Sequence, residues 1–335
     1  MNILLTSAGR RTYLVKYFIE ALNGEGKLHA SNSEMTYALK AADHYFISPL
    51  IYEKNYIESV LDYCTQNKIR AVLTLFDIDL PVLSKNKRRF QEKGITVIVA
   101  DENFIEACND KWLTYTFLKE NGFQVPQTYL SMASAQKDIE QKKLGFPLIV
   151  KPRWGMGSIG IYEADNSEEL FILYNKTLKN IRSSYLKFES GENVNESVII
   201  QEKLNGDEYG LEIFDDLHGN FLTAIPKKKL AMRSGETDIA EIVENPQLYA
   251  IGKKLASLSR HPGNLDVDCF LVNGQFYILE MNARFGGQYP FSHLSGVNFP
   301  KAIIKLLNNL PVPKDLLQAK IGIIGVKDIL PVILK

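Results

Sequence analysis

The chain has 335 residues, and its 39 basic and 39 acidic side chains give a formal net charge of zero. This length exceeds what one ordinary hydrophobic core organises, so two or three domains are expected. The balanced charge gives no electrostatic reason to expect a nucleic acid or an anionic membrane surface as a partner.

The cysteines and the apolar segments indicate the cellular compartment in which the protein is expected. Cys64, Cys108 and Cys269 are too few and too far apart for a disulfide framework or a CxxC zinc site, which fits a reducing compartment. The N-terminus lacks the long apolar segment of a signal peptide, and no run of about 18 apolar residues follows. We therefore expect a cytoplasmic protein that does not contact a membrane.

Short strands and helices alternate over roughly the first 100 residues. Strands are predicted at residues 3–6, 28–31, 45–47, 71–75 and 96–99, and helices at 11–23, 35–42, 54–67 and 80–93. This order predicts an α/β fold that begins with a doubly wound parallel sheet over residues 1–105.

Ligands of such sheets bind beyond the carboxyl ends of the strands. The residues at these ends are Thr6, Ser7, Gly9, Arg10, Phe76, Asp77 and Asp79. The first turn has one glycine where a dinucleotide-binding GxGxxG needs three, so NAD is not expected. For Arg10 and Asp77, substrate binding and an ordinary polar loop are equally compatible with the sequence.

Residues 106–310 are predicted to form a second domain, with a small α/β subdomain at 126–202 and a tail at 311–335. A helix at 112–121 follows a capping Asn109 or Asp110. Residues 183–196 are rich in Ser, Glu, Asn and Gly, and we expect them to be mobile. The apolar stretch 321–335 is expected to pack on this chain or on a partner.

A glycine-rich turn links two predicted strands in the small subdomain. The sequence FPLIVKPRWGMGSIGIY carries an apolar run into Lys151 and then Gly155, Gly157 and Ser158. Glycines let backbone N–H groups approach phosphate oxygens, and a lysine at the strand end supplies charge. The spacing is not that of a Walker A loop. A purely structural glycine hairpin is the alternative.

A third segment offers a surface for a base and a ribose. The strand at 198–200 runs into Gln201, Glu202, Lys203 and Leu204, where a strand edge presents backbone N–H and C=O groups and Leu204 an apolar contact. Glu208, just beyond the turn at Asn205-Gly206, is placed to accept hydrogen bonds from ribose hydroxyls.

The segment DVDCFLVNGQFYILEMNARFGG predicts a hairpin with an acidic face. Strands at 267–272 and 275–281 are joined by Asn273-Gly274, a pair that favours a tight primed turn. Asp268 then lies near Glu280, and Glu280 shares a face with Asn282. These oxygen ligands suit Mg²⁺, and Arg284 adds a fork for phosphate. Taken alone, the hairpin also fits an ordinary solvated acidic pair.

Residues 226–237 are predicted to form a loop that is long enough to act as a lid. Four cations fall within its first eight residues, namely Lys227, Lys228, Lys229 and Arg233. In a solvated loop these charges would simply face water.

These motifs occur in the order seen in ATP-grasp enzymes. The chain resembles most the single-chain ATP-grasp proteins related to the carbamoyl phosphate synthase large subunit, from Asn2 to about Leu310, including the opening LLTSAGRR and the later EMNARFGGQYPF. The resemblance implies a pre-ATP-grasp domain followed by a two-subdomain ATP-grasp fold, in which the small subdomain is a lid and its glycine turn a flap.

The resemblance also implies roles for individual residues. Lys111 corresponds to the first ATP lysine of the family, Lys229 would neutralise the γ phosphate, and Arg233 would hold an anionic substrate group. The implied cofactors are ATP and one or two Mg²⁺ ions, with Mn²⁺ as a substitute. The sequence does not name the substrate.

The implied reaction is ligation: a carboxylate is activated as an acylphosphate and coupled to an amine, with release of ADP and phosphate. The partners would be small molecules, with an amino acid, a peptide or an amino sugar as acceptor, and a homodimer is left open. The alternatives are a carbamoyl-phosphate-type or kinase-like phosphoryl transfer, and an ATP-binding regulatory protein without turnover.

Overall fold

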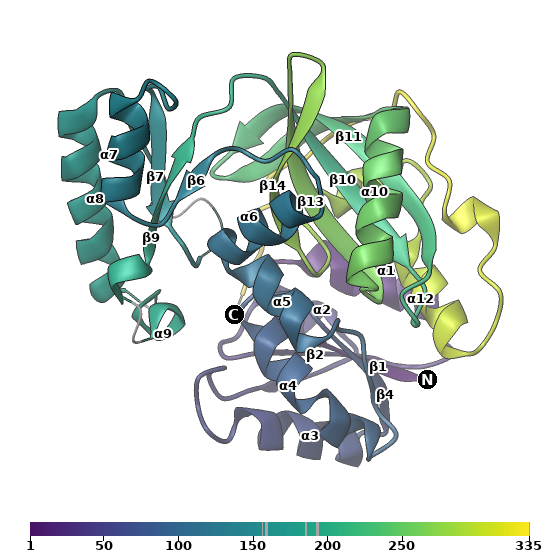
Figure 1. The fold of residues 1–335 in the computed structure, drawn as a ribbon. Coiled ribbons are helices and arrows are strands. Elements are labelled where there is room, and N and C mark those ends of the chain that lie inside the picture. Colours follow the sequence, from purple (N-terminus) through teal and green to yellow (C-terminus); the bar gives the residue numbers. More distant parts are fainter. Residues whose placement is uncertain (156, 158–159, 185, 192–193, 335) are drawn as a thin grey trace.

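The computed structural model describes residues 1–155, 157, 160–184, 186–191 and 194–334, so Ser158 lies outside the described residues. Within these ranges the strands form a five-stranded, a six-stranded and a four-stranded sheet with helices packed around them (Figure 1). The predicted α/β class is confirmed. No helix in the described part of the chain is long and apolar enough to cross a membrane.

The first sheet is parallel and has the order β3-β2-β1-β4-β5. Its strands are β1 (Asn2–Thr6), β2 (Leu28–Asn32), β3 (His44–Ile47), β4 (Ile69–Thr74) and β5 (Thr96–Val97), and its helices are α1 (Thr12–Leu22), α2 (Tyr37–Ala41), α3 (Tyr56–Gln66) and α4 (Asp79–Gln91). Leu4 packs into one core cluster, and Ile3 and Leu5 pack into another on the opposite face. Both faces of the sheet are therefore covered, as the alternating sequence predicts.

The carboxyl ends of β1 and β4 are tied together by Asp79. This fully buried carboxylate accepts hydrogen bonds from Thr6 (2.5 Å), Ser7 (3.1 Å), Thr74 (2.9 Å) and Tyr56 (2.8 Å). Burial raises the pKa of Asp79, and the hydroxyl donors oppose this rise. Three of the predicted ligand positions, Thr6, Ser7 and Asp79, thus bind one another.

The second sheet has the order β14-β13-β10-β11-β12-β15 and follows the linking helices α5 (Glu102–Asn109) and α6 (Lys111–Glu120). Its strands are β10 (Asp207–Asp215), β11 (Phe221–Arg233), β12 (Glu236–Ile242), β13 (Gly263–Val272), β14 (Gln275–Asn282) and β15 (Ile324–Val326). Helix α10 (Pro246–Ser259) lies along one face, while α11 (Tyr289–Leu294) and α12 (Phe299–Leu307) cover the other (Figure 1).

The third sheet, with the order β6-β9-β7-β8, has a core of its own. It consists of β6 (Thr128–Tyr129), β7 (Leu148–Pro152), β8 (Tyr162–Ala164) and β9 (Val198–Glu202), packed against α7 (Met132–Glu140) and α8 (Ser167–Arg182). The three sheets fall inside the predicted ranges 1–105, 106–310 and 126–202, except for β15 beyond residue 310.

One local prediction is wrong. Residues 226–237 are not a loop, because β11 continues to Arg233 and turns through Ser234 and Gly235 into β12. Within 183–196, the described residues include α9 (Leu186–Ser190) and the 3₁₀ turn η1 (Val194–Glu196), and the mobility of this segment stays a prediction.

The C-terminal segment packs only in part. β15 pairs with β12, and η2 (Lys314–Leu316) precedes it, but the later side chains of Ile329 and Leu330 are 70% and 77% exposed.

The Asp79 network predicts a large effect on stability. Asp79→Ala removes the shared acceptor of four hydroxyl groups, and we expect the free energy of unfolding to fall by about 3 kcal/mol. Urea denaturation measures this change. The exposed Asp62→Ala on α3 is the control and should change stability by less than about 0.5 kcal/mol. Equal effects of the two substitutions would contradict the assignment.

Candidate active site

The β13–β14 hairpin has the predicted register. Asn273 and Gly274 have φ angles of 49° and 80°, which suit a primed turn, and Asp268 lies directly across from Glu280. Asp266, which sequence reasoning missed, lies across from Asn282. Cross-strand partners point to the same face, so these four polar side chains line one side of the hairpin.

Strand β10 extends this polar face. Gly210 lies across from Asp268, and Glu212 lies across from Asp266. A Cβ atom on Gly210 would lie 1.5 Å from the Gln288 side-chain oxygen, so only glycine lets Gln288 cover the strand here. The Gln288 amide donates to Asp266 and, at 3.4 Å, to Asp268.

Lys229 joins two of the predicted site carboxylates. Its ammonium lies 2.6 Å from Glu208 and 2.7 Å from Asp268. Burial alone would lower the pKa of Lys229, but Asp268 and Glu208 raise it above its ordinary value. Glu208, predicted to meet a ribose, is here an ion-pair partner of Lys229.

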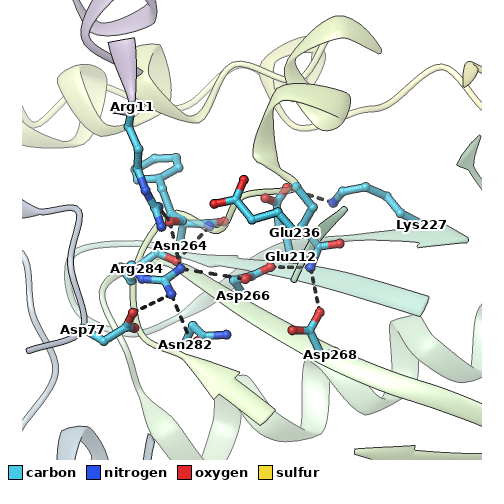
Figure 2. Close-up of polar contacts among 12 residues, drawn as sticks. Arg11, Asp77, Glu212, Lys227, Glu236, Asn264, Asp266, Asp268, Asn282 and Arg284 are labelled. Carbon is cyan, nitrogen blue, oxygen red and sulfur yellow. Dashed lines mark hydrogen bonds and ion pairs between the residues drawn. The ribbon is translucent and has the colours of Figure 1, made fainter. Parts of the chain in front are cut away.

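A buried ion pair lies on the same face of the sheet. Lys227 and Glu212 are fully buried and 3.0 Å apart (Figure 2). Ser292 also donates to Glu212. Burial raises the pKa of the neighbouring Asp266, and the charges of Asp268 and Glu212 raise it further. The buried acidic groups are therefore close enough to influence one another.

Arg284 connects the hairpin to the first domain. Its guanidinium lies 2.6 Å from Asp77 and 4.0 Å from Asp266, and it donates to Asn282 at 3.3 Å (Figure 2). Burial would lower the pKa of Arg284, but Asp77 and Asp266 raise it above its ordinary value. Arg284 therefore stays charged.

The predicted phosphate lysines lie near each other. Lys151 is buried on β7 and donates to the Gln201 side-chain oxygen at 2.7 Å, while Lys111 at the start of α6 donates to the Gly155 carbonyl at 2.5 Å. Burial and the charge of Lys111 lower the pKa of Lys151 to about 8, although Glu280 opposes this shift. Gly155 and, further along the turn, Gly157 have φ angles of 120° and 64°.

The remaining predicted residues have contacts of their own. Glu202 accepts from the Gln127 backbone at 3.1 Å, Lys203 lies 2.6 Å from Glu163, and Leu204 is half-buried after β9. Their contact with a base stays a prediction.

Arg233 is engaged by partners at the end of β11. Its side chain is paired with Asp238 at 2.5 Å and donates to the Lys327 carbonyl at 3.1 Å. Its role toward an anionic substrate group stays a prediction.

One pocket is lined by residues from the first domain, the linking helices, the small subdomain and the β13–β14 hairpin. Its lining consists of Asp77, Ile78, Cys108, Asn109, Lys111, Gly155, Glu189, Glu280 and Asn282. Two predicted metal ligands and the first predicted ATP lysine therefore face one space.

The candidate metal ligands fit Mg²⁺ by chemistry. Asp268, Glu280 and Asn282 supply oxygens on one face of the hairpin, the donor type this ion prefers. Among the described residues no group of three or more His, Cys, Asp or Glu side chains is arranged to hold a metal, so the set would be two carboxylates and one amide. Lys229 contacts the Oδ1 atom of Asp268, so the other oxygen of this carboxylate would be the one to bind the ion.

Sequence comparisons define the class. Residues 108–288 match the family model described as an ATP-grasp domain, and residues 3–98 match the model of a PylC-like N-terminal domain. The chain therefore belongs to the ATP-grasp family, as its motifs predict.

Among curated proteins, the chain is 22% identical over 286 residues to the C-terminal section of the carbamoyl phosphate synthase large chain from Aquifex aeolicus, covering 82% of this chain and 49% of that section. It is 25% identical over 228 residues to acetyl-CoA carboxylase dmxL1 from Cryptosporiopsis sp., covering 64% of this chain and 8% of the carboxylase. The chain thus spans at most half the length of these relatives.

Solved structures support the fold. The L-amino acid ligase from Bacillus licheniformis superposes with a TM-score of 0.72 at 20% identity, over 96% of this chain and 78% of that one. Biotin carboxylase from Campylobacter jejuni gives a TM-score of 0.74 at 17% identity, over 95% and 73%. The predicted order, a parallel-sheet domain followed by an ATP-grasp fold, is confirmed.

Lys151 predicts a pH dependence. A pKa of about 8 means that Lys151 is charged below that pH and loses its charge above it. If Lys151 binds ATP phosphates, kcat/KM for ATP should fall as the pH rises through about 8. Lys151→Arg, which stays charged, should remove this inflection, whereas the exposed control Lys179→Arg on α8 should keep it. An inflection unchanged in Lys151→Arg would exclude this role.

Proposed function

We propose that this chain is an ATP-dependent ligase that activates a carboxylate as an acylphosphate and couples it to an amine. The observation that carries the proposal is the cross-strand pair of Asp268 and Glu280, with Glu280 and Asn282 facing the same pocket as Lys111. Membership of the ATP-grasp family supports it.

Several of the predicted residues then have a role toward ATP. Lys111 and Lys151 bind phosphates beside the glycine turn, and the segment that ends in Leu204 binds the base. Asp268, Glu280 and Asn282 would hold Mg²⁺, which supplies positive charge against the phosphates when bound. Arg284, kept charged by its ion pair with Asp77, would bind the phosphates as well.

The reaction balances as two displacements. A carboxylate oxygen of the substrate bonds to the γ phosphorus while the bond from that phosphorus to the bridging oxygen breaks, and ADP leaves with the electron pair. The amine nitrogen then bonds to the acyl carbon, phosphate leaves with its electron pair, and the amine loses a proton. Lys151 and Arg284 stabilise the negative charge that shifts during transfer.

A contact between the lid and the first domain would protect the intermediate from water. Tyr52, between β3 and α3, donates to Glu189 of α9 at 2.5 Å, and its ring stacks on Phe188 at 5.1 Å. Glu189 also lines the pocket. We infer that this contact holds the lid closed over the acylphosphate.

A second candidate is a bicarbonate-using reaction, because the curated relatives named above are a carboxylase and a carbamoyl phosphate synthase. In it, bicarbonate would be the carboxylate that receives the phosphoryl group. A homodimer also remains a proposal; the 2-oxoglutarate carboxylase domain from Hydrogenobacter thermophilus, a structural neighbour, was solved as a dimer.

The direct test measures ADP and phosphate release from Mg-ATP with a panel of amino acids, peptides, amino sugars and bicarbonate, while mass spectrometry follows the products. The ligase is supported by ADP release that depends on a carboxylate and an amine and yields a condensed product. Release with bicarbonate alone would favour the second candidate, and AMP as the product would exclude acylphosphate chemistry.

Glu280→Gln should lower kcat about 100-fold or more and weaken ATP binding less, because one metal ligand loses its charge while the lysine contacts remain. Steady-state kinetics and nucleotide titration measure the two effects. Glu244→Gln, at an exposed position, is the control. Intact turnover in Glu280→Gln would exclude the metal assignment.

Tyr52→Ala should open the lid contact and uncouple the reaction, so that ADP release exceeds product formation several-fold. The ratio of ADP to condensed product measures this effect. Tyr45→Ala, at an exposed position of β3, should keep the wild-type ratio. A wild-type ratio in Tyr52→Ala would show that the contact does not exclude water.

A further inference from the structure

An ion pair shielded from water connects the linking helix α6 to the small subdomain. The Arg153 guanidinium, directly after β7, contacts both carboxylate oxygens of Asp110 at 2.7 to 2.9 Å. The two side chains are only 10% and 7% exposed. A planar guanidinium that meets both oxygens of a carboxylate holds its partner in one orientation. The pair therefore restricts how the small subdomain can turn relative to α6.

Asp110 also caps α6. Its Oδ1 atom accepts hydrogen bonds from the backbone N–H groups of Trp112 (2.9 Å) and Leu113 (3.3 Å). The backbone N–H of Lys111 donates to the Arg153 carbonyl oxygen at 3.1 Å. The first turn of α6, where Lys111 lies, is thus fixed to the end of β7 by a side-chain contact and a backbone contact.

The two partners of the ion pair belong to units with different hydrophobic cores. Leu118 of α6 packs in the core cluster that contains Met281 of β14, whereas Val150 of β7 packs in the separate core of the small subdomain. Apolar packing holds each unit together. The contact between Asp110 and Arg153 therefore sets the position of one unit against the other.

The two predicted phosphate lysines lie on opposite sides of this contact. Lys111 follows Asp110 directly, and Lys151 precedes Arg153 by two residues. Both ammonium groups donate to neutral oxygen atoms, and neither takes part in the ion pairs found among the described residues. Both lysines therefore keep a positive charge that a bound anion can use.

The two ammonium groups repel each other. Burial lowers the pKa of Lys151, and the charge of Lys111 lowers it further, although Glu280 opposes this shift. Without a restraint, this repulsion favours a larger distance between the lysines. Asp110 and Arg153 neutralise each other, so their pair restrains the lysines without cancelling the lysine charges.

We propose that Asp110 and Arg153 are positioning residues for ATP, which hold Lys111 and Lys151 at a spacing that lets both ammonium groups bind the phosphates at the same time. A turn of the small subdomain would separate the two lysines, because Lys111 lies on α6 and Lys151 on β7. Groups that are fixed before a ligand arrives lose less conformational entropy on binding. This inference rests on the proposed function, in which both lysines bind ATP.

The experiment measures the binding of Mg-ADP by calorimetry, which needs no acyl substrate. The double variant Asp110→Asn/Arg153→Met removes both charges, keeps a capping side chain on α6 and leaves neither partner as an uncompensated buried charge. We expect its Kd to rise about tenfold, because the phosphates lose one of two lysine contacts. The control Arg88→Met/Glu92→Gln removes an exposed ion pair of α4 and should change the Kd less than about twofold.

A second comparison separates positioning from a general effect on folding. In Lys111→Gln only one of the two ammonium groups remains, so there is no spacing to maintain. Adding Asp110→Asn/Arg153→Met to this variant should then raise the Kd less than about twofold. The same tenfold rise with and without Lys111 would show that the ion pair only supports the fold, and it would overturn the inference.

The outcomes also distinguish this inference from the function on which it rests. If the wild-type protein and Asp110→Asn/Arg153→Met bind Mg-ADP equally well, the inference fails while the ligase proposal stands. If the wild-type protein binds no Mg-ADP, the assignment of Lys111 and Lys151 to the phosphates fails, and the inference fails with it. A rise in Kd that depends on Lys111 supports both.

Discussion

The pairing of β13 with β14 is the constraint on which the candidate site depends. Successive side chains of a strand alternate between faces, so a register slip of one residue would turn Asp268 away from Glu280. The Asn273-Gly274 turn fixes this register by adopting positive φ at both positions, and fully buried Met281 anchors the other face. Backbone geometry thus places the candidate oxygen ligands on one face of the hairpin.

Next to the hairpin, an ion pair rather than an apolar contact links β10 and β11 on the polar face of the sheet. A buried ion pair such as Lys227 and Glu212 adds little net stability, because both groups lose their hydration. It does restrict the strands, since a displaced β11 would leave Glu212 buried without a cation. With Arg284 tied to Asp77, the same principle fixes the first domain against the central sheet.

The sequence predicts features that depend on local pattern. The parallel domain follows from the alternation of strands and helices, and the hairpin follows from Asn273-Gly274. The prediction of a loop at residues 226–237 is wrong because a strand that contains buried lysines has the composition of a loop. The acidic residues that pair with these lysines are distant in the sequence, so the sequence does not indicate that the lysines are buried. Substrate binding by the first turn stays a prediction, and in that turn Arg10 is exposed while Arg11 points inward. The sequence reasoning missed Asp266. The alternation of side chains along a strand could have found it, because Asp266 precedes Asp268 by two residues and so lies on the same face.

The burial of Lys227 and Glu212 has a consequence for how this protein changes over evolutionary time. Losing either charge alone leaves the other without compensation, whereas replacing both with apolar groups of similar size is tolerated far better. The two positions should therefore vary together among descendants of a common ancestor. A lineage in which apolar residues have replaced both Lys227 and Glu212 would show that packing can take over from the ion pair. The neighbouring site residues would be unchanged in such a lineage.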